Sequence, residues 1–221
     1  WEGMTLASYV LVVSDDRNGE HARAGLLYLV MAHGGTALLL VVFLFLTERA
    51  GAFDFAALRA AAADLNGTTR TTLFFLALGG FATKAGVVPL HVWLPRAHPA
   101  APSHVSALMS GVMLKVAIYG ILRFAFDLLA PVAGPLPPSW GWTVLFVGTT
   151  SAVLGVLYAL QQHDLKRLLA FHSVENVGII LIGVGLAMTL WRWEGGALAT
   201  VALTAALLHT ANHAAFKGLL F

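Results

Sequence analysis

The chain has 221 residues, of which 58% are apolar and only 11% are charged, and its mean hydropathy is +0.80. Soluble domains carry roughly 25% charged residues, so this composition predicts an all-α polytopic membrane protein. The net charge of +2 is spread without a basic stripe, which argues against nucleic-acid binding. The absence of cysteine excludes disulfides, thiolate metal sites and iron–sulfur ligation by this chain.

Apolar stretches that approach or reach the roughly 20 residues needed to cross a bilayer recur along the chain. The first, residues 1–14, is short and leads into a polar loop at 14–20, and the second runs from 24 to 46. Residues 53–65 are too charged to span, but their helical propensity and apolar spacing predict a helix that lies in the membrane interface.

The third predicted span, at about 71–94, contains a proline in its interior. Pro89 removes one hydrogen bond of the helix and clashes with the preceding turn, so we expect the helix to break near residues 87–89. Broken membrane helices usually line a cavity.

Proline-rich loops at 95–103 and 131–138 and a polar turn at 163–167 separate the remaining spans. These spans are predicted at 105–126, from about 140 to 161, at 168–190 and at 197–221. The sequence therefore predicts about seven transmembrane helices in a single transmembrane domain, residues 1–221. We expect the chain to be an internal fragment of a longer protein, with a helix cut at each end.

Lysine and arginine are segregated along the chain. Lys84, Lys115 and Lys217 lie inside long apolar runs, whereas all nine arginines lie at the ends of such runs or between them. Lysine can lose its proton when it is desolvated, but arginine stays charged at physiological pH. The segregation therefore indicates proton handling at membrane depth.

Six further titratable residues are expected at membrane depth: Glu2, His33, His172, Glu175, His209 and His213. An ionised group at mid-bilayer costs a few kcal/mol on insertion scales, so each needs an explanation. A single buried lysine can be a structural ion-pair partner or can extend to the interface, but the set as a whole favours a functional role. His33, beside two glycines, could also donate a structural hydrogen bond to a neighbouring helix.

His209, His213 and Lys217 recur every four residues and so share one face of the last helix. The histidine pair resembles a metal site, but that helix has no acidic or cysteine ligand and lacks the glutamate of a zinc-protease helix, so we predict no metal. His172 and Glu175, three residues apart, can exchange a proton or form a structural hydrogen-bonded pair.

Several segments resemble one known family. They are Lys84-Ala-Gly-Val-Val-Pro-Leu-His-Val-Trp-Leu-Pro-Arg-Ala-His98, Leu114-Lys-Val-Ala-Ile-Tyr-Gly-Ile-Leu-Arg123, Asp164-Leu-Lys-Arg-Leu-Leu-Ala170 and Asn212-His-Ala-Ala-Phe-Lys-Gly-Leu-Leu-Phe221. They are similar to the antiporter-like membrane subunits of respiratory complex I, of hydrogenase-4 and formate hydrogenlyase complexes, and of multisubunit cation/proton antiporters. Phe171-His-Ser-Val-Glu-Asn-Val-Gly178 is similar to the hydrogenase-4 and formate hydrogenlyase branch.

The resemblance implies a fold of about fourteen helices, of which this chain covers helices five to eleven. It implies that Glu2 on the fifth helix pairs with Lys84 on the broken seventh, and that Lys115 is the lysine of the eighth. His209, His213 and Lys217 would form the polar stripe of the eleventh helix, which completes a proton relay along the membrane plane.

The expected function is therefore that of a proton-translocating subunit of a respiratory or hydrogenase-type oxidoreductase complex. The resemblance implies other membrane subunits and a peripheral redox module as partners, in the inner membrane of a bacterium or archaeon. We expect no cofactor and no redox catalysis in this chain, because it contains no cluster, haem or flavin motif.

Four alternatives remain open at this stage. The chain could belong to a sodium/proton antiporter, with Glu2 or Glu175 helping to bind the cation, or to a complex I-type NADH–quinone oxidoreductase. It could also be a structural scaffold whose buried charges fix helix register. The resemblance further allows a bicarbonate-uptake subunit, although no residue supports that function.

Overall fold

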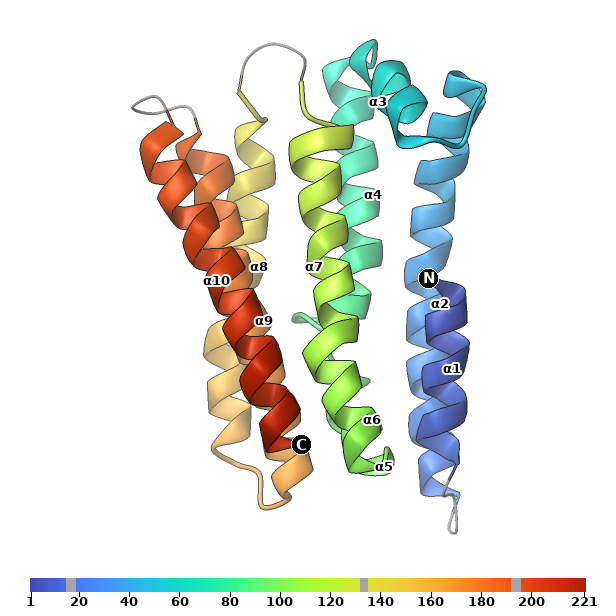
Figure 1. The fold of residues 1–221 in the computed structure, drawn as a ribbon, viewed down its shortest axis with the longest axis vertical. Helices are drawn as coiled ribbons and strands as arrows, with labels where there is room; N and C mark the ends of the chain where they lie inside the picture. The colour runs from blue at the N-terminus through green and yellow to red at the C-terminus, as the bar shows by residue number, and fades with distance from the viewer. Residues whose placement is uncertain (15–18, 132–134, 192–195) are drawn as a thin grey trace.

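The computed structural model describes residues 1–14, 19–131, 135–191 and 196–221, and all the regular elements in these residues are helices. The long helices lie alongside one another, and the short helix α3 (Phe55–Ala63) lies across one end of the bundle (Figure 1). The loops predicted at 14–20 and 131–138 fall partly outside the described residues, as does the polar end of the sixth predicted span.

Each predicted span contains a helix. The N-terminal elements are α1 (Glu2–Val13), α2 (Glu20–Ala50), α3, α4 (Gly67–Ala85) and α5 (Leu94–Ala100). A continuous rod follows, made of α6 (Ser103–Leu108), the π-helical stretch η1 (Met109–Met113), α7 (Leu114–Arg123) and a second π-helical stretch, η2 (Phe124–Leu128). The C-terminal elements are α8 (Pro138–Ala159), α9 (Leu165–Leu190) and α10 (Ala197–Leu220).

The rod lies between two groups of helices. On one side α7 packs on α4, and on the other side η1 and α6 contact α10 (Figure 1). The rod can therefore position polar side chains toward both groups.

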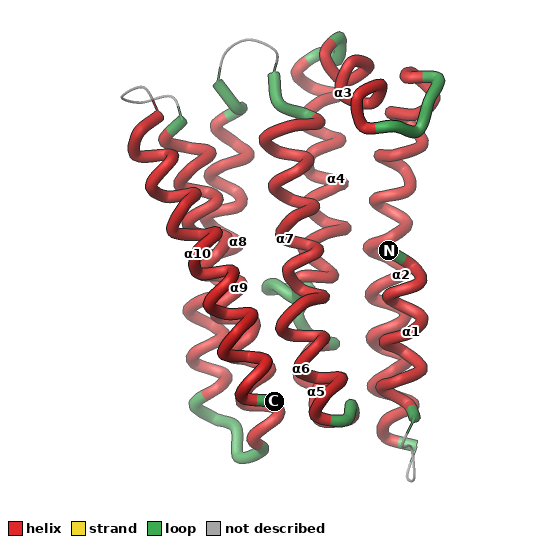
Figure 2. Tube along the Cα trace, in the orientation of Figure 1, coloured by secondary structure: helices red, strands yellow, loops and turns green. Residues whose placement is uncertain are grey.

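The third predicted span is interrupted between Ala85 and Leu94, the stretch in which the break was expected around Pro89. Gly86 ends α4 in the left-handed conformation, with φ of 69°, which glycine adopts without steric cost. The connecting segment lies part-way along the length of the bundle (Figure 2), with Gly86, Val87 and Trp93 buried and Pro89 and Val92 exposed. The indole Nε1 of Trp93 donates to the carbonyl oxygen of Thr83 at 2.9 Å and so ties the far end of this segment back to α4.

Four helical stretches are long and apolar enough to cross a membrane within the described residues: α2, the rod Ser103–Leu128, α8 and α9. The threonines of α4 and the histidines, asparagine and lysine of α10 lower the hydropathy of those two helices. The chain is a multi-pass membrane protein, and many of its large apolar side chains are exposed on the bundle surface, where they can contact lipid.

The helices α8 and α9 approach closely through glycine. A Cβ placed on Gly148 would lie 2.9 Å from the carbonyl oxygen of Gly178, and one on Gly178 would lie 2.6 Å from that of Gly148. Both distances are shorter than a normal contact, so this helix crossing requires glycine on each side.

Candidate functional site

Lys84 is buried at the end of α4, with 1% of its surface exposed. Its Nζ donates a hydrogen bond to Oγ1 of Thr5 on α1 and lies 4.9 Å from the ring centroid of Trp1. The last turn of a helix carries partial negative charge, which stabilises an ammonium group there. Helix position, a hydroxyl acceptor and an aromatic face thus hold this lysine without a direct carboxylate partner.

Glu2 faces His33 and Thr36 on α2. The hydroxyl of Thr36 donates to Oε1 of Glu2, and Nε2 of His33 lies 3.4 Å from Oε2. The expected direct pair of Glu2 with Lys84 does not form, because the lysine bonds Thr5, one turn further along α1. Glu2 and Thr5 are three residues apart and share a face of the helix, so the carboxylate and the hydroxyl that holds the amine lie on the same side of α1.

These five residues, Glu2, Thr5, His33, Thr36 and Lys84, form what we term the N-terminal cluster. The structure gives His33, whose role the sequence left open, a position 3.4 Å from the carboxylate of Glu2. His33 is 52% exposed and the Glu2 side chain 37% exposed, whereas Lys84 is enclosed. The cluster therefore extends from the partly exposed carboxylate of Glu2 to the buried amine of Lys84.

Lys115 on α7 contacts two groups. Its Nζ donates to the carbonyl oxygen of Ser110 at 2.5 Å and lies 2.7 Å from Nδ1 of His213 on α10. Ser110 belongs to η1, and such π-helical stretches occur frequently at functional sites. An ammonium group only donates hydrogen bonds, so with a charged lysine Nδ1 accepts and the neutral imidazole carries its hydrogen on Nε2.

A second set of contacts continues from the same stretch of the rod to Lys217. Oγ of Ser110 lies 2.8 Å from Oγ of Ser173, which donates to the carbonyl oxygen of Leu169 at 3.0 Å. That carbonyl also accepts from Nζ of Lys217 at 2.6 Å. Ser110, Lys115, Ser173, His213 and Lys217 are termed the C-terminal cluster, and all of them except Lys115 are buried.

A branch of this cluster follows α9 and α10. The rings of His213 and His209 are parallel within 6° and 6.5 Å apart, and Nε2 of His209 lies 3.0 Å from Oδ1 of Asn176. Asn176 donates to the carbonyl oxygen of His172, whose Nδ1 lies 2.5 Å from Oε2 of Glu175. The proposed pairing of His172 with Glu175 and the polar stripe on α10 thus meet through one amide side chain.

Met113 belongs to the same π-helical stretch as Ser110 and contacts residues near the N-terminal cluster. Its sulfur accepts hydrogen bonds from the hydroxyls of Tyr28, at 3.5 Å, and Ser8, at 3.6 Å. Tyr28 also faces the N-terminal cluster, because Nζ of Lys84 lies 5.9 Å from its ring centroid. A thioether accepts a hydrogen bond but has no proton to pass on, so this contact does not itself carry a proton from Tyr28 to the rod.

Residues 1–221 match the family described as NADH:quinone oxidoreductase/Mrp antiporter, transmembrane. The chain belongs to this family. It is 50% identical over 221 residues to hydrogenase-4 component B of Escherichia coli K12, covering 100% of this chain and 32% of that protein. It is 36% identical over 201 residues to formate hydrogenlyase subunit 3 of the same organism, covering 91% of this chain and 32% of that protein.

A solved structure of the membrane-bound sulfane sulfur reductase, an archaeal respiratory membrane complex, is similar to this antiporter-family chain with a TM-score of 0.82. The two are 28% identical, and the match covers 98% of this chain and 42% of that one. The chain spans about a third of the length of the curated relatives it matches. These similarities confirm the predicted family and the predicted resemblance to its hydrogenase-4 and formate hydrogenlyase branch.

Sequence reasoning missed the hydroxyl and amide groups that connect the titratable residues of this antiporter-family chain. Ser110, Ser173 and Asn176 stand inside or beside recognised motifs, but short polar side chains in an apolar helix are usually assigned to helix packing. Thr5 and Thr36 lie four residues from a helical carbonyl that each can bond, so nothing in their spacing indicates an interhelical partner.

Proposed function

We propose that the chain is part of a proton-translocating membrane subunit of a respiratory or hydrogenase-type oxidoreductase complex. In this proposal its seven predicted spans correspond to helices five to eleven of a fourteen-helix subunit. The partners are other membrane subunits and a peripheral redox module, in the inner membrane of a bacterium or archaeon. The hydrogen-bonded contact of Lys115 with His213, inside a buried polar network, carries the proposal.

The relay begins at the N-terminal cluster. A proton resides on Lys84, and the nearby carboxylate of Glu2 favours the charged amine through space. A movement that takes the carboxylate of Glu2 further from Lys84 weakens this attraction and releases the proton. The hydroxyl of Thr5 keeps an acceptor on the lysine while the carboxylate moves.

The C-terminal cluster receives the proton at Lys115. Its contact with His213 allows one proton to be shared between an amine and an imidazole from different helices. From there one branch leads over His209 toward Asn176 and Glu175, and the other leads over the serine hydroxyls toward Lys217. Backbone carbonyls accept hydrogen bonds but do not carry protons, so transfer past the carbonyl oxygens of Ser110 and Leu169 requires water.

Transfer between the clusters is the controlled step in this scheme. Met113 separates Tyr28 from the rod residues that hold Lys115, and a methionine side chain is flexible enough to change rotamer. A conformational or electrostatic signal from the redox module opens this barrier and moves the carboxylate of Glu2 at the same time. Water then connects the two lysines.

The test is proton uptake by the full complex in proteoliposomes carrying Lys84→Met or Lys115→Met. Each should lower uptake per electron transferred by at least about tenfold, because each removes a proton carrier. Lys166→Met is the matched control, because that amine bonds the carbonyl oxygen of Ala101 at a helix junction and lies outside both clusters. Unchanged uptake in either test variant removes its lysine from the relay, and a strict requirement for sodium would favour the antiporter alternative.

A further inference from the structure

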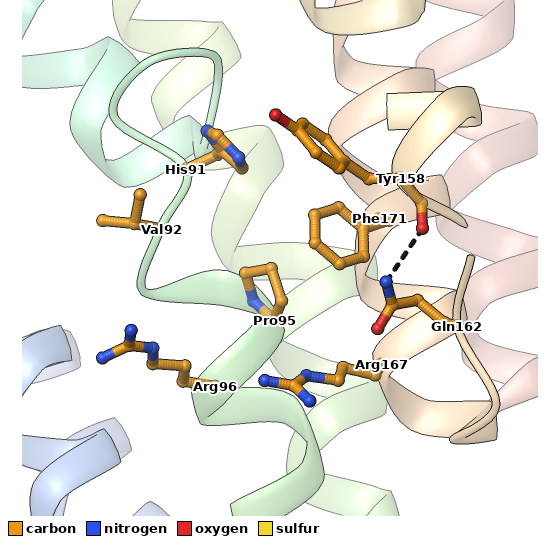
Figure 3. Close-up of a pocket in the computed structure, with 8 residues that line it drawn as sticks. All are labelled: His91, Val92, Pro95, Arg96, Tyr158, Gln162, Arg167 and Phe171. Carbon is orange, nitrogen blue, oxygen red and sulfur yellow. Dashed lines mark hydrogen bonds between the residues drawn. The ribbon is translucent and has the colours of Figure 1, made fainter. Parts of the chain in front are cut away.

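A cleft opens where the interrupted helix meets the junction of α8 and α9 (Figure 3). Its volume is about 380 Å³, and its wall includes His91, Arg96, Tyr158, Arg167 and Phe171. A second hollow of about 580 Å³ shares Arg96 and Arg167 with it. We term the two together the arginine cleft.

The arginine cleft has a charged end and an aromatic end. The side chains of Arg96 and Arg167 lie at one end, and the rings of His91, Tyr158 and Phe171 lie at the other (Figure 3). The rings contact one another, with centroids 5.4 Å apart for Tyr158 and Phe171 and 6.3 Å apart for His91 and Tyr158. A ligand that spans the first hollow therefore meets cations at one end and apolar faces at the other.

Positive side chains outnumber acids in the cleft, and its first hollow is lined by two arginines. Neither guanidinium of Arg96 and Arg167 has a side-chain hydrogen bond or ion pair with the part of the chain that the structure describes, and no acid lines the first hollow. Glu20 and Asp164 line the second hollow together with Arg23. Oδ1 of Asp164 accepts from the amide of Arg167 as the N-cap of α9, and neither acid forms an ion pair with the guanidinium of Arg96 or Arg167 among the described residues. The arginine pair thus offers its donors to an anion from outside.

The cleft lies at the depth of a membrane surface. The short connection from Ala159 to Leu165 between two spanning helices is polar and mostly exposed, as expected for a turn at the interface. Leu160 and Leu165 on the same junction are nevertheless 78% and 67% exposed, which suits contact with lipid. Arg96 and Arg167 are exposed at this level, while Phe171 lies further along α9, toward the bilayer interior.

We propose that the arginine cleft binds one anionic phospholipid. The phosphate accepts hydrogen bonds from the guanidinium groups of Arg96 and Arg167, and the start of an acyl chain packs on the rings of Tyr158 and Phe171. Guanidinium groups match phosphate geometry well, and basic pockets between membrane helices recognise acidic head groups. This proposal does not depend on the proton relay.

The charges of Arg96 and Arg167 also argue against a role of the empty cleft as an entry path for cations. Two fixed guanidinium charges raise the electrostatic barrier to a hydrated proton or a sodium ion. A bound phosphate group neutralises the two charges. The lipid that carries it fills the cleft beside His91, so cations are then excluded by the lack of space. The bound lipid would therefore seal and stabilise the junction of the interrupted helix with α8 and α9.

The experiment measures lipid binding to the full-length protein, delipidated in detergent, by native mass spectrometry with phosphatidylglycerol or phosphatidylcholine. The wild type should bind at least one phosphatidylglycerol about tenfold more tightly than phosphatidylcholine. Arg96→Gln and Arg167→Gln should each weaken phosphatidylglycerol binding about fivefold, and the double variant about 25-fold. Arg49→Gln is the matched control, because that arginine lies over the ring of Phe45 at the other end of α2 and should leave binding unchanged.

Two further arms distinguish the lipid from a free anion and from lost folding. Millimolar inorganic phosphate should not displace phosphatidylglycerol, because the acyl chain also contributes to binding; displacement would overturn the proposal. The head-group preference is measured on the wild type and does not depend on any variant. Equal binding of phosphatidylglycerol and phosphatidylcholine by the wild type would therefore overturn the proposal. The double variant Arg96→Lys with Arg167→Lys should bind phosphatidylglycerol more tightly than the double glutamine variant. If it keeps the wild-type melting temperature and binds no better, the role assigned to the two charges is contradicted.

Discussion

Nζ of Lys115 lies 2.7 Å from Nδ1 of His213, so one hydrogen bond joins the titratable groups of α7 and α10. The two helices are held in register there by a contact that depends on where one proton lies. Moving the proton changes both the charge and the donor pattern at this junction. This contact is the point at which charge and helix position are coupled most directly.

Replacing His213 separates titration from geometry. His213→Gln keeps a side-chain oxygen that can accept from Lys115 but cannot take up a proton, whereas His213→Leu removes both properties. We expect proton uptake by the full complex to fall at least about tenfold in both variants. Uptake that survives in His213→Gln but not in His213→Leu would assign the histidine a positioning role alone.

The hydroxyls of Ser110 and Ser173 share one hydrogen bond of 2.8 Å. Removing either hydroxyl removes the same link, so Ser110→Ala and Ser173→Ala should each lower proton uptake, and the double variant should be no worse than either single one. Each change should cost about 1 kcal/mol of stability, as expected for a buried neutral hydrogen bond. Additive losses of uptake in the double variant would contradict a shared link.

Met113 is predicted to keep the two clusters apart when the complex is idle. Met113→Ser shortens the side chain and supplies a hydroxyl, so water should connect Tyr28 with the rod and passive proton leak through proteoliposomes should rise several-fold. Met113→Leu keeps the volume and should leave the leak unchanged. A leak that is equal in the serine variant and the wild type would remove Met113 as the barrier.

The glycine contact between α8 and α9 should not tolerate a methyl group. Gly148→Ala or Gly178→Ala places a Cβ less than 3 Å from the opposite backbone, and overpacking of this kind costs about 1–3 kcal/mol. Gly34→Ala is the control, since its added Cβ meets no atom within 4 Å. Thermal unfolding of the purified protein should show the difference, and equal stability of all three variants would show that the helices separate without cost.

The sequence predicts the helices well because apolar length and proline position are local properties. Pro89 marks the interruption directly, and the structure places the end of α4 at Ala85 and the start of α5 at Leu94. Length and composition alone identify four of the seven predicted spans, since the polar side chains of α4 and α10 lower the hydropathy of those helices. Hydropathy is therefore lower in the helices that carry Lys84, His213 and Lys217.

The site is predicted less completely because hydrogen-bond partners depend on how helices rotate. Lys84, Lys115 and His213 could be singled out by residue type and burial, but their partners come from other helices at large sequence separations. The expected direct contact of Glu2 with Lys84 fails for this reason, since a change of one turn on α1 substitutes Thr5 for the carboxylate. No periodicity specifies that register.

The indole bond of Trp93 to Thr83 joins the two halves of the interrupted helix one residue away from Lys84. A tilt of α5 cannot proceed far without stretching this bond or dragging the last turn of α4 along with it. Motion of α5 is thereby conveyed to the backbone that carries the buried amine of Lys84. Because one hydrogen bond makes the connection, a small displacement of α5 is enough to shift the end of α4.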